Sequence, residues 1–430
     1  MQASRKKWLV VTYFANEGGM ACSHHIDDRL PLLRERGIDV TLLTTLIVPK
    51  NPSVRHLRTP TLSPSGIRFE VRQYFKRKHL PKWQFELIVT LLLLPVLPFY
   101  LLERALFRID TTWYWTPLAA LRGYLLCRRN RPDLIYSTGG PACAHIAAGW
   151  IAGRTGIPWV AELQDPLVHS YCGRSAAELR IVYRAERYIC GNADRVIFLT
   201  GEAARRAASR TDLDDRGVCI YPGASSFHGA PQPWERRETM RFAHFGTLSG
   251  VRNLASFIRG LEEAVAHHPH LQETVEVHLF GNAEKDVRRQ IEESPCRGMF
   301  MLHGLVPRDR VVAEMRGSDV LLLVQGVDDV SAETIPSKAY EYFHARRPVL
   351  GLVYKNPELR GVLENLGHVA VEADKRKEIR DGLLHFVERW RSGALAEPAG
   401  GSHFTVERAV ERLIALASEA GEAHTEGEGG

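Results

Sequence analysis

Two glutamates stand around a Pro-Ser-Lys core in the segment Glu333-Thr-Ile-Pro-Ser-Lys-Ala-Tyr-Glu341. Pro336 and Ser337 predict a helix start with Ser337 as the N-cap residue. The N–H groups and positive dipole end of that helix suit a diphosphate, to which Lys338 in the first turn adds a full charge. Glu341 follows on the same helix face, where a carboxylate could accept hydrogen bonds from vicinal ribose hydroxyls. Glu333 precedes the helix and could reach a sugar hydroxyl beyond the phosphate.

The elements that must position this segment are short apolar strands separated by helix-length stretches. In the N-terminal half, strands alternate with helices such as 20–36 and 142–155, which favours a parallel sheet covered on both faces. This pattern predicts one doubly wound α/β domain at residues 1–224. Its expected strands are Trp8–Phe14, Val40–Thr45, Ile67–Phe75, Leu134–Thr138, Trp159–Leu163, Val196–Thr200 and Val218–Tyr221.

The same pattern restarts after an aperiodic, proline-bearing linker at 222–239. We expect a second doubly wound domain at 239–398, a final amphipathic helix at 403–419 and a disordered tail at 420–430. Ligands bind at the carboxyl ends of parallel strands, so the two Rossmann-like domains are expected to face each other across a cleft that holds the site. The expected strands of the second domain are Arg241–Gly246, Val275–Phe280, Phe300–Leu305, Val320–Gln325, Val349–Val353 and His368–Val371.

Residues 72–108 depart from this plan. A basic cluster precedes the uncharged run Leu87–Leu102, which contains Pro95 and Pro98. The run is shorter than the roughly 20 residues that span a bilayer, and two prolines weaken a straight span. We therefore expect an interfacial anchor, with cations on anionic headgroups and apolar side chains at the acyl boundary. The alternative is a buried crossover helix with a solvated charged flank. The basic residues are Arg72, Lys76, Arg77, Lys78 and Lys82.

The bulk composition excludes several other classes of protein. Hydrophobic residues make up 45% and charged residues 25%, as in ordinary soluble globular proteins. A net charge of +6 over 430 residues does not indicate a nucleic-acid binder, so no nucleic-acid partner is expected. The 7 cysteines are scattered without a CxxC pair, which indicates reduced thiols in a cytosolic protein and argues against structural zinc.

The spacing of Glu333 and Glu341, with SKAYEY and ARRPVL around it, closely resembles the glutamate–seven–glutamate motif of family 4 retaining glycosyltransferases. The pair follows a VLLLV strand and precedes a PVLGLV strand, which makes the signal strong. Other segments resemble that family's opening glycine loop and first helix, its mid-domain strand and loop, the start of its donor domain and its last helix. These are FANEGGMACSHHIDDRLPLLRERGIDVTLLTT, IPWVAELQDP, FAHFGTLSGVRNLASFIRGL and FTVERAVERL. The resemblance covers nearly the whole chain and implies the two-domain GT-B fold.

The resemblance also implies roles for single residues. Glu333 would contact the donor sugar, Lys338 the diphosphate and Glu341 the ribose. Two glycines of the opening loop would let the backbone approach the donor phosphate or the acceptor, although an ordinary strand-to-helix turn would use the same residues. The residues implied to bind the donor are Gly18, Gly19, Gly246, Arg252, Ser337, Lys338 and Glu341.

Two of the implied roles rest on looser matches. Arg252, after the GTLSG loop, would be a second phosphate cation suited to a bidentate contact. Many relatives carry an Arg…Lys pair closer to the glycine, and the alternative is a solvated arginine. Asp165 in ELQDP lies where many relatives have a histidine near the transferred sugar. It would orient the acceptor hydroxyl or serve as a base, and the alternative is an Asp-Pro turn that caps the strand end.

The implied reaction is transfer of a hexosyl or N-acetylhexosaminyl group from a UDP- or GDP-sugar with retention of configuration. The departing diphosphate would help deprotonate the acceptor, and the protein would contribute positioning and stabilising charge through Glu333, Asp165 and Lys338. Neither a cofactor nor a metal is needed. Asp212-Leu213-Asp214 has the spelling of a metal-binding Asp-x-Asp, but it follows a polar helix and is expected to be a solvated loop.

A membrane-associated N-terminal domain suggests a lipid-linked or polysaccharide acceptor, as in capsule, exopolysaccharide or O-antigen assembly. The expected location is cytoplasmic, peripheral to the inner face of the plasma membrane. A GT-B nucleotide-sugar epimerase would not need the apolar insertion, and a non-catalytic nucleotide-sugar-binding subunit would not need the intact glutamate pair. A dinucleotide-dependent dehydrogenase would require Gly-x-Gly-x-x-Gly after the first strand, where this chain has only Glu-Gly-Gly.

Overall fold

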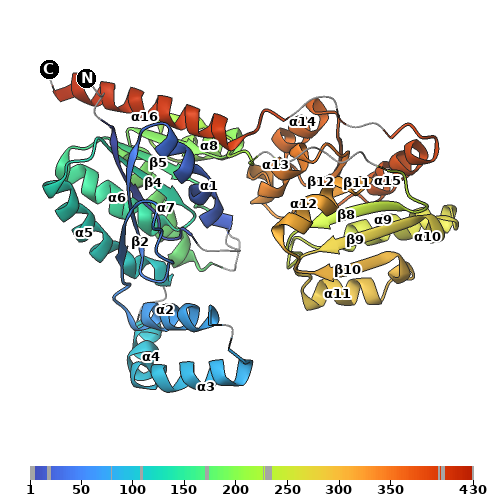
Figure 1. The fold of residues 1–430 in the computed structure, drawn as a ribbon, viewed down its shortest axis with the longest axis horizontal. Helices are drawn as coiled ribbons and strands as arrows, with labels where there is room; N and C mark the ends of the chain where they lie inside the picture. Colours follow the sequence, from blue (N-terminus) through green and yellow to red (C-terminus); the bar gives the residue numbers. More distant parts are fainter. Residues whose placement is uncertain are drawn as a thin grey trace. The chain divides into compact units, whose positions relative to one another are not determined.

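The computed structural model describes residues 5–16, 21–78, 80–106, 110–169, 174–225, 227, 235–395, 398 and 402–428. The chain divides into two compact units, here called unit 1 (Met1–Tyr221 with Ala409–Gly430) and unit 2 (Pro222–Arg408). Each unit contains one parallel sheet flanked by helices (Figure 1). The predicted α/β class with two doubly wound domains is therefore confirmed.

The sheet of unit 1 has 7 strands in the order β3-β2-β1-β4-β5-β6-β7, and each neighbouring pair is parallel. The chain leaves β1 toward one edge and returns through β4 toward the other, so the switch point lies between β1 and β4. Strands β4 and β5 are buried along their whole length because helices cover the sheet. The strands are β1 (Lys7–Val11), β2 (Asp39–Thr45), β3 (Arg55–Thr59), β4 (Leu134–Gly139), β5 (Trp159–Leu163), β6 (Arg195–Phe198) and β7 (Gly217–Cys219).

The helices that flank this sheet include the last helix of the chain, α16 (Val406–Glu428). Lys6 Nζ donates to Ser418 Oγ at 3.0 Å, and Arg36 pairs with Glu411 at 2.9 Å, so α16 packs on unit 1. The helix continues as far as Glu428, whereas a disordered tail was predicted from residue 420. The other helices are α1 (Ala21–Glu35), α5 (Thr116–Arg129), α6 (Ala142–Thr155), α7 (Ala176–Asn192) and α8 (Gly201–Ala208).

Between β3 and α5 the chain forms a helical insertion, α2 (Pro64–Lys76), α3 (Lys82–Leu93), η1 (Leu94–Val96) and α4 (Leu97–Leu106), followed by η2 (Thr111–Trp115). The predicted strand Ile67–Phe75 is wrong, because these residues belong to α2. Ser63 accepts a hydrogen bond from Gly66 N, and Pro64 occupies the first helical turn. Both are helix-start signals, and they outweigh the local alternation of apolar and polar residues.

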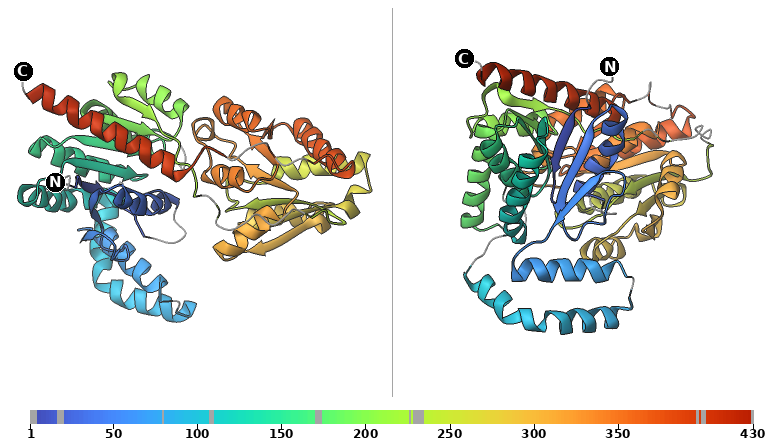
Figure 2. Two further views of the ribbon diagram at one scale, coloured as in Figure 1. Left: turned by 45° about the horizontal axis from the view of Figure 1, so that its top comes forward. Right: turned by 60° about the vertical axis from the view of Figure 1, so that its left-hand side comes forward.

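The three helices of the insertion are tied to one another by polar contacts. Glu103 of α4 accepts from the Ser65 N–H at 2.9 Å and from the Ser65 hydroxyl, at the start of α2. Arg68 Nη1 donates to Tyr100 Oη at 2.9 Å. Arg72 of α2 lies over the Phe85 ring of α3. Figure 1 shows α3 and α4 as two helices beside α2, and Figure 2 shows the bend between them.

The apolar side chains of α3, η1 and α4 are mostly exposed. In the part of the chain that the structure describes, Lys82–Leu106 is the one segment long and apolar enough to cross a membrane by length and composition. Its most apolar stretch has a mean hydropathy of 2.2, and only 6% of it is buried. The alternative of a buried crossover helix is therefore wrong. The exposed residues are Trp83, Leu87, Leu91, Leu92, Leu94, Leu97, Phe99, Leu101, Leu102 and Leu106.

The sheet of unit 2 has 6 strands in the order β10-β9-β8-β11-β12-β13, again with parallel pairs. Its switch point lies between β8 and β11, whose C-terminal ends lead into the loops at 246–254 and 325–336. Such a point is where doubly wound sheets bind ligands. The strands are β8 (Met240–Phe245), β9 (Val275–Phe280), β10 (Phe300–Gly304), β11 (Val320–Val324), β12 (Val349–Val353) and β13 (Val369–Glu372).

The core of unit 2 lies between this sheet and two helices, α9 (Ala255–His267) and α15 (Arg376–Arg391), which also pack on each other. Buried members include Phe242, Phe257, Leu350 and Phe386. The remaining helices are α10 (Leu271–Thr274), α11 (Lys285–Glu292), α12 (Arg308–Arg316), α13 (Ser337–His344) and α14 (Pro357–Asn365).

Candidate functional site

The Pro-Ser-Lys segment forms the start of α13, directly after the loop that follows β11. Pro336, with φ −57° and ψ 132°, is the N-cap residue, and Ser337 is already helical. The prediction of Ser337 as N-cap is therefore wrong, because the extended ψ of Pro336 places the boundary one residue earlier. Proline has no side-chain acceptor, and no side chain caps this helix start. In the first turn the Ala339 N–H donates to the Pro336 oxygen at 2.9 Å, and the N–H groups of Ser337 and Lys338 are left to a ligand or to solvent.

Lys338 and Glu341 form an ion pair on the first turns of α13. Lys338 Nζ lies 2.9 Å from both carboxylate oxygens of Glu341. Their side chains are 35% and 22% exposed, so the pair is accessible and contributes at most about 1 kcal/mol to stability. A bound diphosphate would compete with Glu341 for Lys338, and the carboxylate would then be released to accept from hydroxyl groups.

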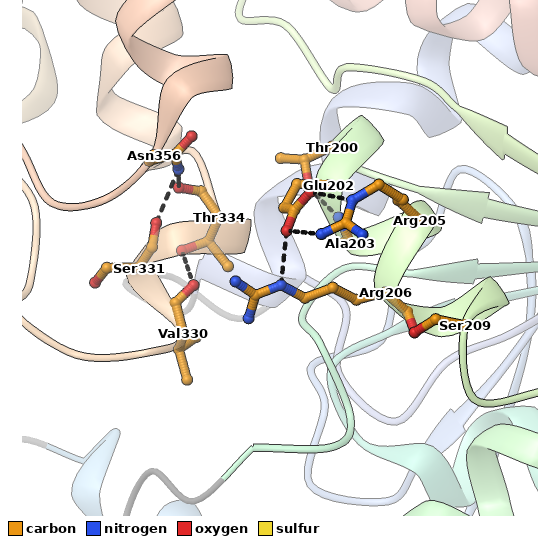
Figure 3. Close-up of polar contacts among 10 residues, drawn as sticks. All are labelled: Thr200, Glu202, Ala203, Arg205, Arg206, Ser209, Val330, Ser331, Thr334 and Asn356. Carbon is orange, nitrogen blue, oxygen red and sulfur yellow. Dashed lines mark hydrogen bonds and ion pairs between the residues drawn. The ribbon is translucent and has the colours of Figure 1, made fainter.

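Glu333 lies in the short turn η6 (Ser331–Glu333) and is buried. Two amides hold the backbone of this turn. Gln325, at the end of β11, donates to the carbonyl oxygens of Ser331 and Thr334, the latter at 2.8 Å. Asn356 donates to the same two oxygens at 2.8 and 2.9 Å (Figure 3). The position of Glu333 is therefore set by a turn that is fixed from two sides.

Gly246 follows β8 with φ 145°, a conformation that L side chains rarely adopt. The neighbouring Gly281 packs against it so closely that a Cβ at 281 would lie 2.1 Å from the Gly246 carbonyl oxygen. Arg252 is exposed in the loop that follows, where its backbone exchanges hydrogen bonds with Ser249 at 2.9 and 3.0 Å. Val327 N donates to the Val251 oxygen at 3.2 Å, which joins this loop to the one after β11.

One further contact connects α13 with the end of β8. The Tyr342 hydroxyl accepts a hydrogen bond from Phe245 N at 2.8 Å, and both side chains are buried. Burial raises the pKa of Tyr342, so its hydroxyl remains protonated. Through this contact and the loop pairing, the structure gathers Gly246, Arg252, Lys338 and Glu341 at the switch-point edge of the unit 2 sheet, which Glu333 also joins.

In unit 1, the opening-loop glycines Gly18 and Gly19 lie outside the described residues. The residues on either side of them are held by Asp27 of α1. Asn16, with φ 52°, donates its N–H to Asp27 Oδ1 at 2.6 Å, and Ser23 Oγ donates to Asp27 Oδ2 at 2.5 Å. The buried His145 bonds to Ser137 Oγ and to the Gly139 oxygen, so it has a structural role.

Asp165 follows β5 and lies over a glycine. A Cβ at Gly140 would be 2.9 Å from Asp165 Oδ2, so the bare backbone at 140 makes room for this carboxylate. The Asp165 side chain is accessible to solvent, and desolvation by nearby protein raises the pKa of its carboxyl. An accessible carboxyl at the end of a central strand can orient a hydroxyl or accept its proton.

A buried polar network lies beneath Asp165. Glu162 of β5 pairs with Arg29 of α1 and accepts from Tyr136 Oη at 2.9 Å and from Thr138 Oγ1 at 3.1 Å. Burial alone would raise the pKa of Glu162, but the Arg29 guanidinium holds it below its usual value. Gln164 Nε2 donates to Thr138 Oγ1 at 3.0 Å, which ties the residue before Asp165 to the same network.

At the next strand end, Thr200 caps α8 by accepting from Ala203 N at 3.1 Å (Figure 3). Glu202 in the first turn accepts from Arg205 and Arg206, and the hydrogen bonds from Arg205 lower its pKa to about 2. These arginines are thus paired with Glu202, and sequence reasoning assigned them no role.

Residues 30–224 match the family model of the glycosyl transferase 4-like domain. Solved structures match nearly the whole chain. HepE of Anabaena has a TM-score of 0.64 at 13% identity, with 96% of this chain and 100% of HepE covered. TarM of S. aureus has a TM-score of 0.62 at 10% identity, with 96% and 99% covered. A trehalose-phosphate synthase of Burkholderia xenovorans has a TM-score of 0.62 at 12% identity, with 96% and 100% covered.

No curated protein sequence matches this chain. The chain has the GT-B glycosyltransferase fold, and its residues 30–224 are similar to the glycosyl transferase 4-like domain. The predicted resemblance to GT-B glycosyltransferases is confirmed. The retaining chemistry and the type of glycan assembly stay predictions.

Sequence reasoning missed three residues of unit 2 that lie at or near the candidate site. Gln325 and Asn356 each follow the C-terminal end of a strand, and a polar side chain at that place was the available signal. His244 lies just before Gly246, and the apolar strand FAHF around it gave no signal of a site residue.

The Asp212–Asp214 segment lies in a turn in which Asp214 has φ 50° and Asp212 pairs with Arg187. Within the described ranges, no group of three or more His, Cys, Asp or Glu residues could hold a metal ion.

Proposed function

We propose that this protein is a retaining glycosyltransferase that moves a sugar from a nucleotide-sugar to a lipid-linked or polysaccharide acceptor at the cytoplasmic face of a membrane. The observation that carries the proposal is the set of groups at the unit 2 switch point. An uncapped helix start, an ion pair that a diphosphate can open, and a buried glutamate in a fixed turn lie at one sheet edge. A nucleotide diphosphate-sugar needs such groups, because its diphosphate requires N–H donors and a cation, and its ribose and sugar hydroxyls require carboxylate acceptors.

The donor is proposed to be a UDP- or GDP-sugar. The HepE structures contain UDP with glucose and UDP-glucose, which favours UDP among the two. In the proposed arrangement, Lys338 and the α13 N-terminus bind the diphosphate, Glu341 the ribose and Glu333 the sugar. Arg252 adds a second cation from the 246–254 loop.

The chemistry proposed is charge stabilisation and positioning. As the glycosidic bond to the diphosphate breaks, negative charge grows on the leaving phosphate, where Lys338, Arg252 and the α13 N–H groups lower its energy. The departing phosphate accepts the proton of the acceptor hydroxyl, which Asp165 orients. Because the protein supplies this positive charge itself, the mechanism needs neither a metal nor a cofactor.

The acceptor proposal depends on the insertion of unit 1. Its exposed leucines and aromatic residues resemble the apolar face of a helix that lies in a membrane interface. The basic residues Arg72, Lys76, Arg77, Lys78 and Lys82 precede these apolar residues in the sequence, and their charge suits anionic headgroups. Pro95, in the 3₁₀ turn between the bent helices α3 and α4, fits surface attachment better than a straight span.

A soluble acceptor is the competing candidate. The trehalose-phosphate synthase of B. xenovorans was solved with glucose-6-phosphate, so the GT-B fold also serves sugar phosphates. A water-soluble acceptor gives no reason for a large exposed apolar face, which is costly in water. That face favours a membrane-bound acceptor. It also distinguishes the proposal from a nucleotide-sugar epimerase, which has no use for a membrane.

The decisive experiment is a thermal-shift screen of UDP-, GDP-, ADP- and dTDP-sugars in EDTA. A ligand at a hundred times its Kd adds about 2.7 kcal/mol of stability. One nucleotide-sugar is expected to stabilise the wild type, and Lys338→Ala and Glu341→Gln are expected to abolish the shift. Lys375→Ala is the matched control, because Lys375 also pairs with a glutamate three residues on, at 3.2 Å. A shift that survives both substitutions, or no shift with any donor, would favour a non-catalytic subunit.

A further inference from the structure

A buried histidine lies at the strand end that carries Gly246. His244 belongs to β8, and its Nδ1 lies 2.9 Å from the backbone oxygen of Leu322 on β11. Since a carbonyl oxygen only accepts hydrogen bonds, Nδ1 carries the proton. The Nε2 atom of the neutral ring therefore holds a lone pair and is a hydrogen-bond acceptor.

The surroundings of Nε2 point to a ligand. Nε2 is buried and has no hydrogen-bond partner among the residues that the structure describes. Buried acceptors without a partner destabilise a protein and are uncommon in native structures, so a partner from outside the chain is indicated. A Cβ built on Gly246 would lie only 3.6 Å from Nε2, so the glycine leaves this side of the ring open.

The charges nearby place His244 in the donor site and fix its state. Burial lowers the pKa of His244 to about 4, and the positive charges of Arg252 and Lys338 contribute to this shift in the same direction. The ring is therefore neutral near pH 7. These two cations are the ones proposed to bind the diphosphate. Ionised phosphate oxygens only accept hydrogen bonds and cannot pair with the Nε2 lone pair, whereas a hydroxyl group can.

We propose that His244 is a specificity residue of the donor site, and that its Nε2 accepts a hydrogen bond from a hydroxyl of the bound nucleotide-sugar. The inference rests on the proposed function and adds a residue to that site. The hydroxyl belongs either to the ribose or to the transferred sugar, and the two sources give different binding patterns.

The test uses the full chain and His244→Asn. The asparagine amide takes the place of Nδ1–H and keeps the bond to Leu322, while the Nε2 acceptor is removed. Affinities for UDP and UDP-glucose, or for GDP and GDP-mannose if GDP binds, are measured by calorimetry. His368→Asn is the matched control, since His368 is also buried in unit 2 with an unpartnered Nδ1, but lies beside Phe343. We expect roughly tenfold weaker binding in His244→Asn and unchanged binding in His368→Asn.

Each outcome decides between named alternatives. Weaker binding of both nucleotide and nucleotide-sugar assigns the ribose, and weaker binding of the nucleotide-sugar alone assigns the transferred sugar. A wild type that binds no nucleotide contradicts the proposed function itself. Equal binding by wild type and folded His244→Asn overturns only the role of His244. If the variant does not fold, deoxy analogues of the ribose and sugar are tested on the wild type, and no loss with any of them also overturns it.

Discussion

Three leucines of the helical insertion, Leu87, Leu91 and Leu102, are 53%, 62% and 57% exposed. If α3 and α4 lie in a membrane interface, these side chains are transferred from water to the acyl boundary. Replacing all three with serine should then release the protein from vesicles. Because the three side chains are exposed in the protein, the same change should alter the free energy of unfolding by no more than about 0.5 kcal/mol each.

The magnitude follows from the exposed area. Full burial of a leucine side chain is worth about 2 kcal/mol, and somewhat more than half of each side chain remains to be buried. Each leucine therefore contributes about 1 kcal/mol, and the three together about 3 kcal/mol. This corresponds to a roughly hundredfold fall in the vesicle partition coefficient.

The assay is flotation of the full chain with vesicles of phosphatidylcholine and phosphatidylglycerol. The matched control replaces Leu121 and Leu125 with serine. These leucines are 48% and 47% exposed, but they lie on α5, outside the insertion. We expect the control to float like the wild type. Binding should also weaken with salt, because the basic cluster acts through screened charges.

Two results would refute the reasoning. Equal flotation of the triple variant and the wild type would show that these leucines do not enter the bilayer. Equal losses in the triple variant and the α5 control would show that any exposed leucine contributes, so that the insertion has no special role.

Three further predictions concern the buried contacts. Tyr342→Phe removes the acceptor of Phe245 N and should lower the free energy of unfolding by about 1–3 kcal/mol in urea titration; an unchanged midpoint would contradict that contact. Asn356→Ala removes the hydrogen bond from Leu359 N and both bonds to the Glu333 turn. We expect the free energy of unfolding to fall by about 2 kcal/mol and the nucleotide-sugar to bind more weakly. Unchanged affinity for the nucleotide-sugar would show that Glu333 does not depend on the hydrogen bonds from Asn356. Desolvation lowers the pKa of His145 to about 4, below its unfolded value near 6.5, so the unfolded state binds more protons between these pH values. Stability should therefore fall as the pH drops from 6.5 to 4, by up to about 1.4 kcal/mol per pH unit for this group, and less steeply in His145→Asn; parallel pH profiles would exclude His145 as a cause.

The sequence predicted strands well where short segments rich in apolar residues, buried over most of their length, stand between helix-length stretches. Trp159–Leu163, Val275–Phe280 and Val349–Val353 are strands with those bounds. The prediction failed where local signals conflicted. Ile67–Phe75 alternates like a strand but follows the helix-start pair Ser63-Pro64. Strand β3, Arg55–Thr59, was missed because RHLRT is polar and the strand lies at the sheet edge.

The candidate site was also predictable only in part, namely for the residues that are close together in the sequence. Glu333, Lys338 and Glu341 are close in sequence, so helix geometry alone predicted their relation. The residues that hold them come from elsewhere in the chain. Gln325 and Asn356 reach the Glu333 turn across two loops, and His244 lies on a different strand. No local pattern specifies such contacts, because they depend on which strands are neighbours in the sheet.

The buried pair of Arg29 and Glu162 is better explained by positioning than by stability. Replacing a buried ion pair with well-packed apolar residues often costs nothing in stability. This pair, however, lies under the end of β5 and links through Thr138 to Gln164, the residue before Asp165. An apolar replacement would remove the acceptor that holds Thr138, and with it the polar support of the 164–165 loop. The network thus holds Gln164, the residue before Asp165, as Gln325 and Asn356 hold the backbone of the Glu333 turn in unit 2.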